Sequence, residues 1–209
     1  IQRLIGGTGN DTFQFHSDTH TDINIDGGGG DGEENKVSYA SVDGDLSVTL
    51  GDVTARLQNI HLLEGNYTEE RNNAACLNVT GSGDYIWAID GINSGTVGIK
   101  DGNATTRFTG FNQLQGAPDS NEFLLNADLS GERAEVVGGA GENRFVLDTV
   151  LTTAITGGSG TNRFELTENA QINGVLDGSA GRSTLVGFDA DLIWEIQADS
   201  TVTIFASPV

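Results

Sequence analysis

The chain has 209 residues, of which 30 are acidic, 10 are Lys or Arg and 30 are glycine, and its formal net charge is −20. Nucleic acids and anionic membranes attract clustered Lys and Arg, so this charge argues against both as partners. No run of residues is long and apolar enough to insert into a membrane, and the single cysteine, Cys76, excludes an internal disulfide. We expect Cys76 to be a small buried side chain.

A unit of twelve residues recurs along the chain, first at residues 4–15. It consists of an aliphatic residue, a Gly-rich corner, an Asn or Asp, and a short strand with alternate apolar residues. Close copies lie at 136–147 and 155–166, and looser copies at 114–125 and 176–187. The copies from 114 onward begin about 19 to 22 residues apart, which is the length of one coil of a solenoid.

Strand geometry predicts which residues of the unit point inward, because residues two apart share a face. If successive units stack in register, equivalent residues form columns along the molecule. The predicted apolar columns are Phe123, Phe145, Phe164 and Leu185; Leu125, Leu147 and Leu166; and Leu114, Val136, Ile155 and Leu176. The predicted polar column is Asn121, Asn143, Asn162 and Ser183, with Asp11 in the corresponding place of the first unit.

The repeat therefore predicts an all-β chain folded as a parallel β-helix, a solenoid with coils of about 19–24 residues. We expect residues 1–209 to form a single β-helix domain and to be part of a longer repeat protein, since a unit already begins at Leu4. Regularity is weakest between residues 65 and 109. There, residues 64–73 are interpreted as a polar excursion and residues 101–104 as a tight turn.

Residues 6–14 match the calcium-binding nonapeptide of repeats-in-toxin proteins, G-G-x-G-x-D-x-U-x. Systematic calcium binding is not expected, because tandem nonapeptides are missing and later units carry the neutral Asn143 and Asn162 in place of the carboxylate. A single calcium site remains a candidate. Its ligands would be Asp11, Asp26 and Asp31, and the alternative is that these are solvated corner carboxylates.

Potential metal ligands also alternate along the segment between the first two units. His16, Asp18, His20 and Asp22 would share one face of an extended strand, where two histidines spaced i, i+2 can chelate a transition metal. The segment lies where an exposed bend is expected. A solvated loop is therefore the alternative interpretation.

Enzymatic β-helices that act on uronic-acid polymers gather carboxylates with Arg or Lys on one outer face. The candidate carboxylates have no basic neighbour in sequence, although a distant coil could supply one; they are Asp43, Asp45, Asp84, Asp189 and Asp191. The outward positions place Glu122 beside Arg144, which we interpret as a surface ion pair. We assign no catalytic residue.

The aromatic residues Tyr85 and Trp87 share one face of a short predicted strand. If that face is inward, both belong to the core. If it is outward, they are candidates for stacking on sugar rings, as is Trp194.

The runs at residues 58–65 and 111–116 precede Gly-rich corners, and residues 174–181 match the pattern G-x-[IVL]-D-G-G-x-G closely. In these repeats the chain resembles filamentous-haemagglutinin-like exoproteins and biofilm matrix adhesins of Gram-negative bacteria. The resemblance implies secretion to the cell surface and a rod-like role in attachment. The implied partners are other cells, exopolysaccharide or other surface molecules, and further copies of the chain.

We therefore expect a non-enzymatic structural rod of a secreted bacterial adhesin, with no cofactor apart from the candidate calcium ion. One alternative is a polysaccharide-active β-helix enzyme, a lyase or an epimerase. Another is a calcium-binding repeat domain of a secreted toxin or protease.

Overall fold

The computed structural model of the protein describes residues 3–16, 24–30, 32–51, 57–102, 105–196 and 202–206. These residues form strands and no helix, so no helix among them could cross a membrane, and the all-β prediction is confirmed. The strands are β1 (Arg3–Gly7), β2 (Thr12–Gln14), β3 (Asn24–Gly28), β4 (Lys36–Ser38), β5 (Leu46–Leu50), β6 (Leu57–Gln58), β7 (Leu62–Glu64), β8 (Ala75–Val79), β9 (Tyr85–Gly91), β10 (Ser94–Ile99), β11 (Thr105–Thr109), β12 (Gln113–Gln115), β13 (Asn121–Leu125), β14 (Glu135–Val137), β15 (Glu142–Leu147), β16 (Val150–Leu151), β17 (Ala154–Thr156), β18 (Thr161–Leu166), β19 (Gln171–Ile172), β20 (Leu176–Asp177), β21 (Arg182–Val186), β22 (Leu192–Ile196) and β23 (Val202–Ala206).

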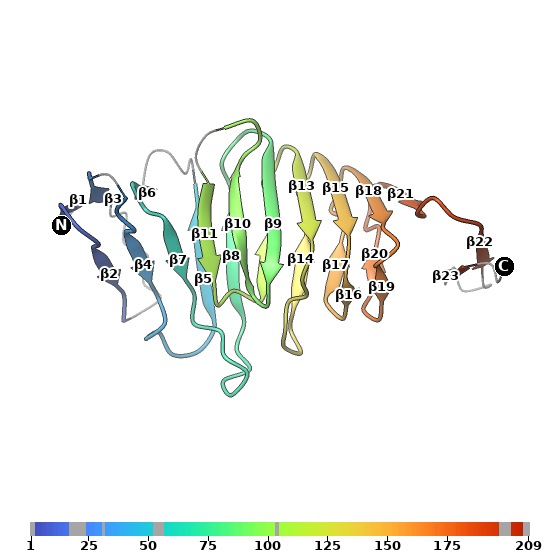
Figure 1. The fold of residues 1–209 in the computed structure, drawn as a ribbon, viewed down its shortest axis with the longest axis horizontal. Coiled ribbons are helices and arrows are strands. Elements are labelled where there is room, and N and C mark those ends of the chain that lie inside the picture. Colours follow the sequence, from blue (N-terminus) through green and yellow to red (C-terminus); the bar gives the residue numbers. More distant parts are fainter. Residues whose placement is uncertain are drawn as a thin grey trace.

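Most strands belong to two sheets that run along the long axis of the molecule (Figure 1). The larger sheet has ten strands in the order β2-β4-β7-β11-β10-β9-β13-β15-β18-β21, and the smaller has six in the order β20-β17-β14-β12-β8-β5. From β12 onward the chain alternates between the sheets, because β12, β14, β17 and β20 of the smaller sheet are each followed by a strand of the larger one. Smaller sheets are formed by β1-β3-β6, β16-β19 and β22-β23.

The predicted apolar columns are confirmed by the pairing of parallel strands. Phe123 pairs with Phe145, Phe145 with Phe164, and Phe164 with Leu185, and the first three are almost completely buried. Trp87 continues this column, with its ring centroid 5.5 Å from that of Phe123. The other two columns pair in the predicted register, and Leu125, Leu147, Leu114, Val136 and Ile155 are also buried.

The stretch in which the repeat was weakest contains the antiparallel part of the larger sheet. β9 and β10 form a hairpin, β10 pairs antiparallel with β11, and β11 pairs parallel with β7. Gly95 sits where the register shifts, and a Cβ there would lie 2.0 Å from the carbonyl oxygen of Ala88. The twenty-residue period is lost here because the chain doubles back instead of advancing to the other sheet.

The interpretation of residues 64–73 as a polar excursion is correct only in part. These residues lie outside the sheets apart from the end of β7, but Asn66, Tyr67 and Asn73 are buried. Asn66 Nδ2 donates to the carbonyl oxygens of Val42 and Gly44. The buried Asn66 therefore holds the loop against the preceding turn, whereas residues 68–72 are exposed, as expected of a polar excursion.

The polar column is a ladder of buried carboxamides at the start of β13, β15 and β18. Asn121 Nδ2 donates to Asn143 Oδ1 at 3.0 Å, and Asn143 Nδ2 donates to Asn162 Oδ1 at 3.0 Å. Each Asn is at most 3% exposed. The corner glycines make room for them, because a Cβ on Gly138 would lie 2.7 Å from Cγ of Asn143. Because each bond contributes about 0.5–1.5 kcal/mol net, the ladder stabilises the stacking as well as its register.

Candidate functional site

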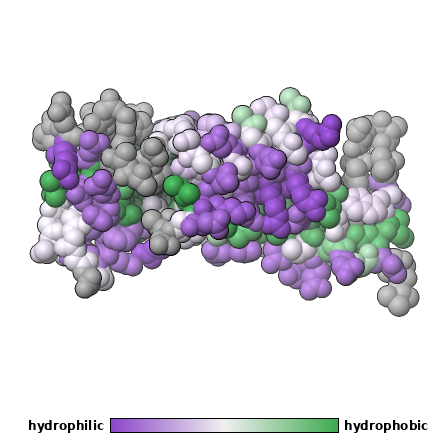
Figure 2. All heavy atoms as spheres, turned by 90° about the horizontal axis from the view of Figure 1, so that it is seen from above, coloured by the Kyte–Doolittle hydropathy of each residue, from purple (hydrophilic) through white to green (hydrophobic). Residues whose placement is uncertain are grey.

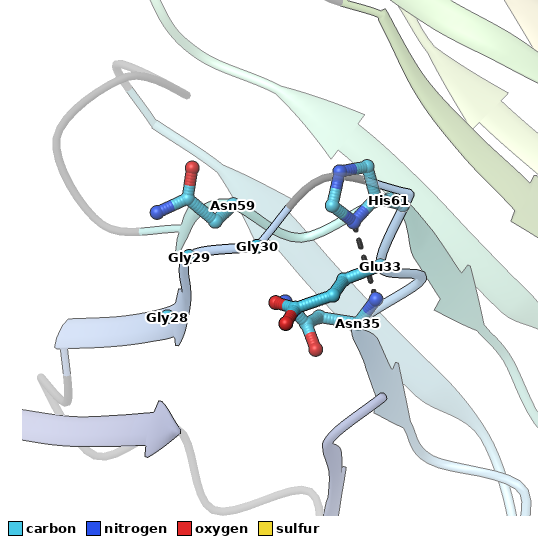
Figure 3. A pocket seen from close by; sticks show the side chains of 7 residues that line it. All are labelled: Gly28, Gly29, Gly30, Glu33, Asn35, Asn59 and His61. Atoms are coloured by element: carbon cyan, nitrogen blue, oxygen red, sulfur yellow. Dashed lines mark hydrogen bonds between the residues drawn. The ribbon is translucent and has the colours of Figure 1, made fainter. Parts of the chain in front are cut away.

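A pocket of about 440 Å³ lies beside the Gly-rich corner that follows β3 (Figure 3). Its lining residues are Gly28, Gly29, Gly30, Glu33, Asn35, Asn59 and His61. The register of β2, β4 and β7 aligns Asp11, Asn35 and His61, the residues before each strand, and so brings Asn35 beside His61 in this pocket. This alignment gives the N-terminal half of the molecule a polar column of its own, of which the sequence predicted only Asp11.

Hydrogen bonds to the backbone hold the polar side chains of this pocket. Glu33 Oε1 accepts from the Gly9 N–H at 2.5 Å, and Asn35 Oδ1 accepts from the Asp11 N–H at 2.8 Å. His61 Nδ1 accepts from the Asn35 N–H at 3.1 Å, as the dashed line in Figure 3 marks. Figure 3 also shows the side chains of Glu33 and Asn35 extending toward the Gly28–Gly30 segment.

The candidate calcium ligands have protein partners where the structure describes them. Asp11 Oδ2 accepts from the Gly7 N–H at 2.8 Å. Asp26 accepts from the Gly28 N–H, the Asn59 carboxamide and Arg3, with which it forms an ion pair of 2.9 Å.

These partners lower the pKa of Asp26, the Gly28 N–H most strongly. Both oxygens of Asp26 thus accept from cationic or N–H donors, an arrangement that does not suit a cation ligand.

The third candidate ligand, Asp31, lies outside the described residues. Within the described part of the chain, no three His, Cys, Asp or Glu side chains are grouped so that they could hold a metal ion. In the alternating segment, His16 is described, but Asp18, His20 and Asp22 are not. Both metal sites therefore stay predictions.

A second group of charges lies on the outer face of β13, β15 and β18. Glu122 pairs with Arg144 as predicted, and Arg144 also pairs with Glu165 at 2.6 Å. Lys100 reaches Glu122 at 2.9 Å, and Arg163 contacts Glu165. We call these five residues the charged strip. In Figure 2 hydrophilic residues cover much of the middle of the molecule, over β9 to β18.

The charged strip borders a shallow pocket of about 370 Å³. Its lining includes Asp84, Lys100, Glu122, Glu142, Arg144 and Arg163. Lys100, and then Arg144, lower the pKa of Glu122, and Arg144 lowers the pKa of Glu165. The two carboxylates are therefore ionised at neutral pH and compensate the charge of the cations. The sequence predicted only the Glu122–Arg144 pair, because Lys100 comes from the antiparallel hairpin.

The other candidate carboxylates do not form one cluster with Asp84. Asp45 pairs with Arg133 at 2.8 Å, and its pKa is lowered by the Ala74 N–H and then by Arg133. A distant part of the chain thus supplies a basic partner, as the sequence allowed. Asp43, Asp189 and Asp191 are exposed.

Of the two orientations considered for Tyr85 and Trp87, the structure shows the inward one. Tyr85 and Trp87 are 1% and 0% exposed, so they belong to the core and cannot stack on a sugar ring. Trp194 is 40% exposed on β22. Cys76 is partly buried on β8, and this burial, followed by the charge of Glu135, raises the pKa of its thiol.

Comparison with known proteins identifies no relatives. No protein-family model matches the chain, and no curated protein or solved structure is similar to it. The resemblance to bacterial adhesins therefore depends on the repeat pattern alone.

Proposed function

We propose that the chain is a structural rod segment of a large secreted adhesin, folded as a parallel β-helix. One observation supports this most strongly: the column from Trp87 through Phe123, Phe145 and Phe164 to Leu185 runs through five paired strands in unbroken register. Alternation of the chain between the two sheets from β12 onward is the path that a solenoid requires.

The stacked columns suit a part that bears load. Each parallel strand in the middle of the sheets hydrogen-bonds to two neighbours, and the rings of Phe123, Phe145 and Phe164 stack at 5.0 and 4.9 Å. Each such aromatic pair adds about 0.5–1.5 kcal/mol beyond its burial. Because every unit buries its apolar residues against its neighbours, tension is shared among many short ladders and no single residue carries the function.

The proposal places the protein outside a Gram-negative cell, where it would hold cells to each other, to exopolysaccharide or to surfaces. The high negative charge supports solubility at high density, and the paired state of Lys100, Arg144 and Arg163 argues against a nucleic-acid surface. The resemblance of the repeats to those of matrix adhesins also supports a role in attachment.

Two measurements test the proposal. Small-angle scattering should give an elongated particle whose cross-section is constant along its length. Display of the chain on a non-adherent bacterium should increase cell aggregation or retention on a polysaccharide-coated surface, compared with display of a globular domain of equal size. A compact particle, or adhesion no greater than that of the control, would contradict it.

The pocket beside the charged strip favours a second candidate, a lyase or epimerase acting on uronate polymers. Lys100, Arg144 and Arg163 could bind the uronate carboxylates, and Asp84 or Glu142 could accept a proton. The ion pairs of all three cations weigh against it. Two assays on polyuronates distinguish the rod from the enzyme: one for unsaturated products, which a lyase forms by elimination, and one for a changed ratio of the two C5 epimers, which an epimerase produces. A rod gives neither result.

A further inference from the structure

Two buried polar atoms at the pocket of Figure 3 have no hydrogen-bond partner: Oε2 of Glu33 and Nδ2 of Asn35. Asn35 as a whole is 0% exposed. In the ladder, the Nδ2 atoms of Asn121 and Asn143 both donate to the next residue of the column. Asn35 occupies the equivalent position before β4, but its Nδ2 does not donate to the next residue of its column. Since buried polar groups are almost always paired, this exception needs a physical reason.

The hydrogen bonds that these side chains already make determine which of their donor and acceptor atoms remain free. Asn35 Oδ1 accepts from the Asp11 N–H, so Nδ2 is the free donor of that carboxamide. Glu33 Oε1 accepts from the Gly9 N–H, so Oε2 is the free acceptor. His61 Nδ1 accepts from the Asn35 N–H, which leaves Nε2 as the donor of the ring. The wall of the pocket thus contains an unused carboxylate oxygen and an unused N–H donor, two residues apart in the chain and both closed to solvent in this structure.

A hydroxyl group can pair with either the free acceptor or the free donor, because each hydroxyl both donates and accepts. A metal ion fits poorly, since the hydrogens on Asn35 Nδ2 carry positive charge. An anionic group fits poorly too, because the Glu33 carboxylate would repel it. Neighbouring hydroxyls on one ring could satisfy both residues at once. The cavity of about 440 Å³ is within the range of small-molecule sites.

We propose that this pocket binds a hexose residue of an uncharged polysaccharide. Glu33 accepts a hydrogen bond from one hydroxyl, and Asn35 donates to its neighbour. Neither free atom is open to solvent, so binding requires both side chains to turn toward the cavity. The Glu33 carboxylate does so about its terminal torsion, which is soft, and exchanges the oxygen that accepts from the Gly9 N–H. The use of this site for attachment rests on the proposed function, whereas sugar binding itself does not.

The test is a binding titration with the full chain. The probes are free galactose, glucose and mannose, an uncharged polymer such as dextran or galactan, and the polyuronate alginate. The variant Glu33→Gln keeps the size of the side chain and the acceptor for Gly9, but it puts an NH₂ group in place of the free oxygen. Loss of a charge-assisted hydrogen bond should weaken binding of the uncharged probe at least about tenfold.

The matched control is Glu168→Gln, the same change at an exposed carboxylate that lines neither pocket, and it should leave affinity unchanged. Absence of binding to every uncharged probe would overturn the proposal, and so would tighter binding of alginate, or loss of binding in Glu168→Gln but not in Glu33→Gln. Calcium alone binding at Glu33 would overturn it as well. Small-angle scattering from the same variants reports the shape of the particle separately from sugar binding. Failure to bind sugar therefore does not contradict the proposed rod, and a compact particle does not contradict sugar binding.

Discussion

The rings of Phe145 and Phe164 lie 4.9 Å apart with only 12° between their planes, one on β15 and the other on β18. They are 0% and 4% exposed. Their side chains stack because the two strands pair in parallel with identical residues aligned, Asn with Asn, Arg with Arg and Phe with Phe. This contact joins successive units of the repeat and so connects the sequence period to the stability of the whole molecule.

Replacing Phe145 by Ala should destabilise the protein by about 3–5 kcal/mol, because it opens a cavity between two stacked rings. Chemical denaturation followed by circular dichroism measures the change. Val150→Ala is the control, since Val150 is 47% exposed, and it should cost less than about 0.5 kcal/mol. Equal effects of the two substitutions would show that the aromatic column is not the core.

Asn143→Ala should cost about 2–4 kcal/mol, because it leaves the buried N–H of Gly139 and one of the two Nδ2 hydrogens of Asn121 without an acceptor. The same denaturation experiment measures it. Asn173→Ala, at an exposed position on the surface, should be close to neutral. If Asn143→Ala were neutral too, the ladder would contribute nothing to stability.

Deletion of one complete unit, residues 136–154, should give a folded protein shorter by about 4.8 Å. The reason is that Ile155 then takes the place of Val136 in the column, and Phe164 that of Phe145. Deletion of residues 136–145 removes half a unit, breaks every column and should abolish cooperative unfolding. Cooperative melting of both deletion variants would contradict the proposed solenoid.

Burial raises the pKa of Tyr39 to about 12, from 10 for an exposed tyrosine. The folded state therefore binds the phenolic proton more tightly than the unfolded state does. The resulting stability is complete below pH 10 and is lost as pH rises from 10 to 12, on the order of 2 kcal/mol in total. Tyr39→Phe should show a smaller loss over this range in denaturation at fixed pH. Parallel loss in both proteins would contradict a buried phenol.

Removal of calcium should leave the melting temperature unchanged, because both oxygens of Asp26 already accept from protein donors. Circular dichroism melts with a chelator and with added calcium measure this. A melting temperature that falls with the chelator and recovers with calcium would instead support the calcium-binding repeat domain and a site at Asp11, Asp26 and Asp31.

The candidate sites were less predictable than the core. Glu122 and Arg144 occupy equivalent positions of neighbouring units, so the period alone brings them together. Lys100 joins them only because β9 and β10 pair as an antiparallel hairpin, and the repeat does not predict that hairpin. In the same way, Glu33 and Asn35 meet His61 through the register of β4 with β7, and these strands lie outside the copies of the unit recognised in the sequence.

The columns and the ladder could be derived from the sequence because stacking converts an equal spacing along the chain into contact in space. Phe123, Phe145, Phe164 and the asparagines before them needed no other information. Only the tertiary structure placed Trp87 on the end of that column and left Asn35 Nδ2 buried without a partner. Both outcomes depend on where non-repeating segments lie, and long-range packing, not local spacing, decides that.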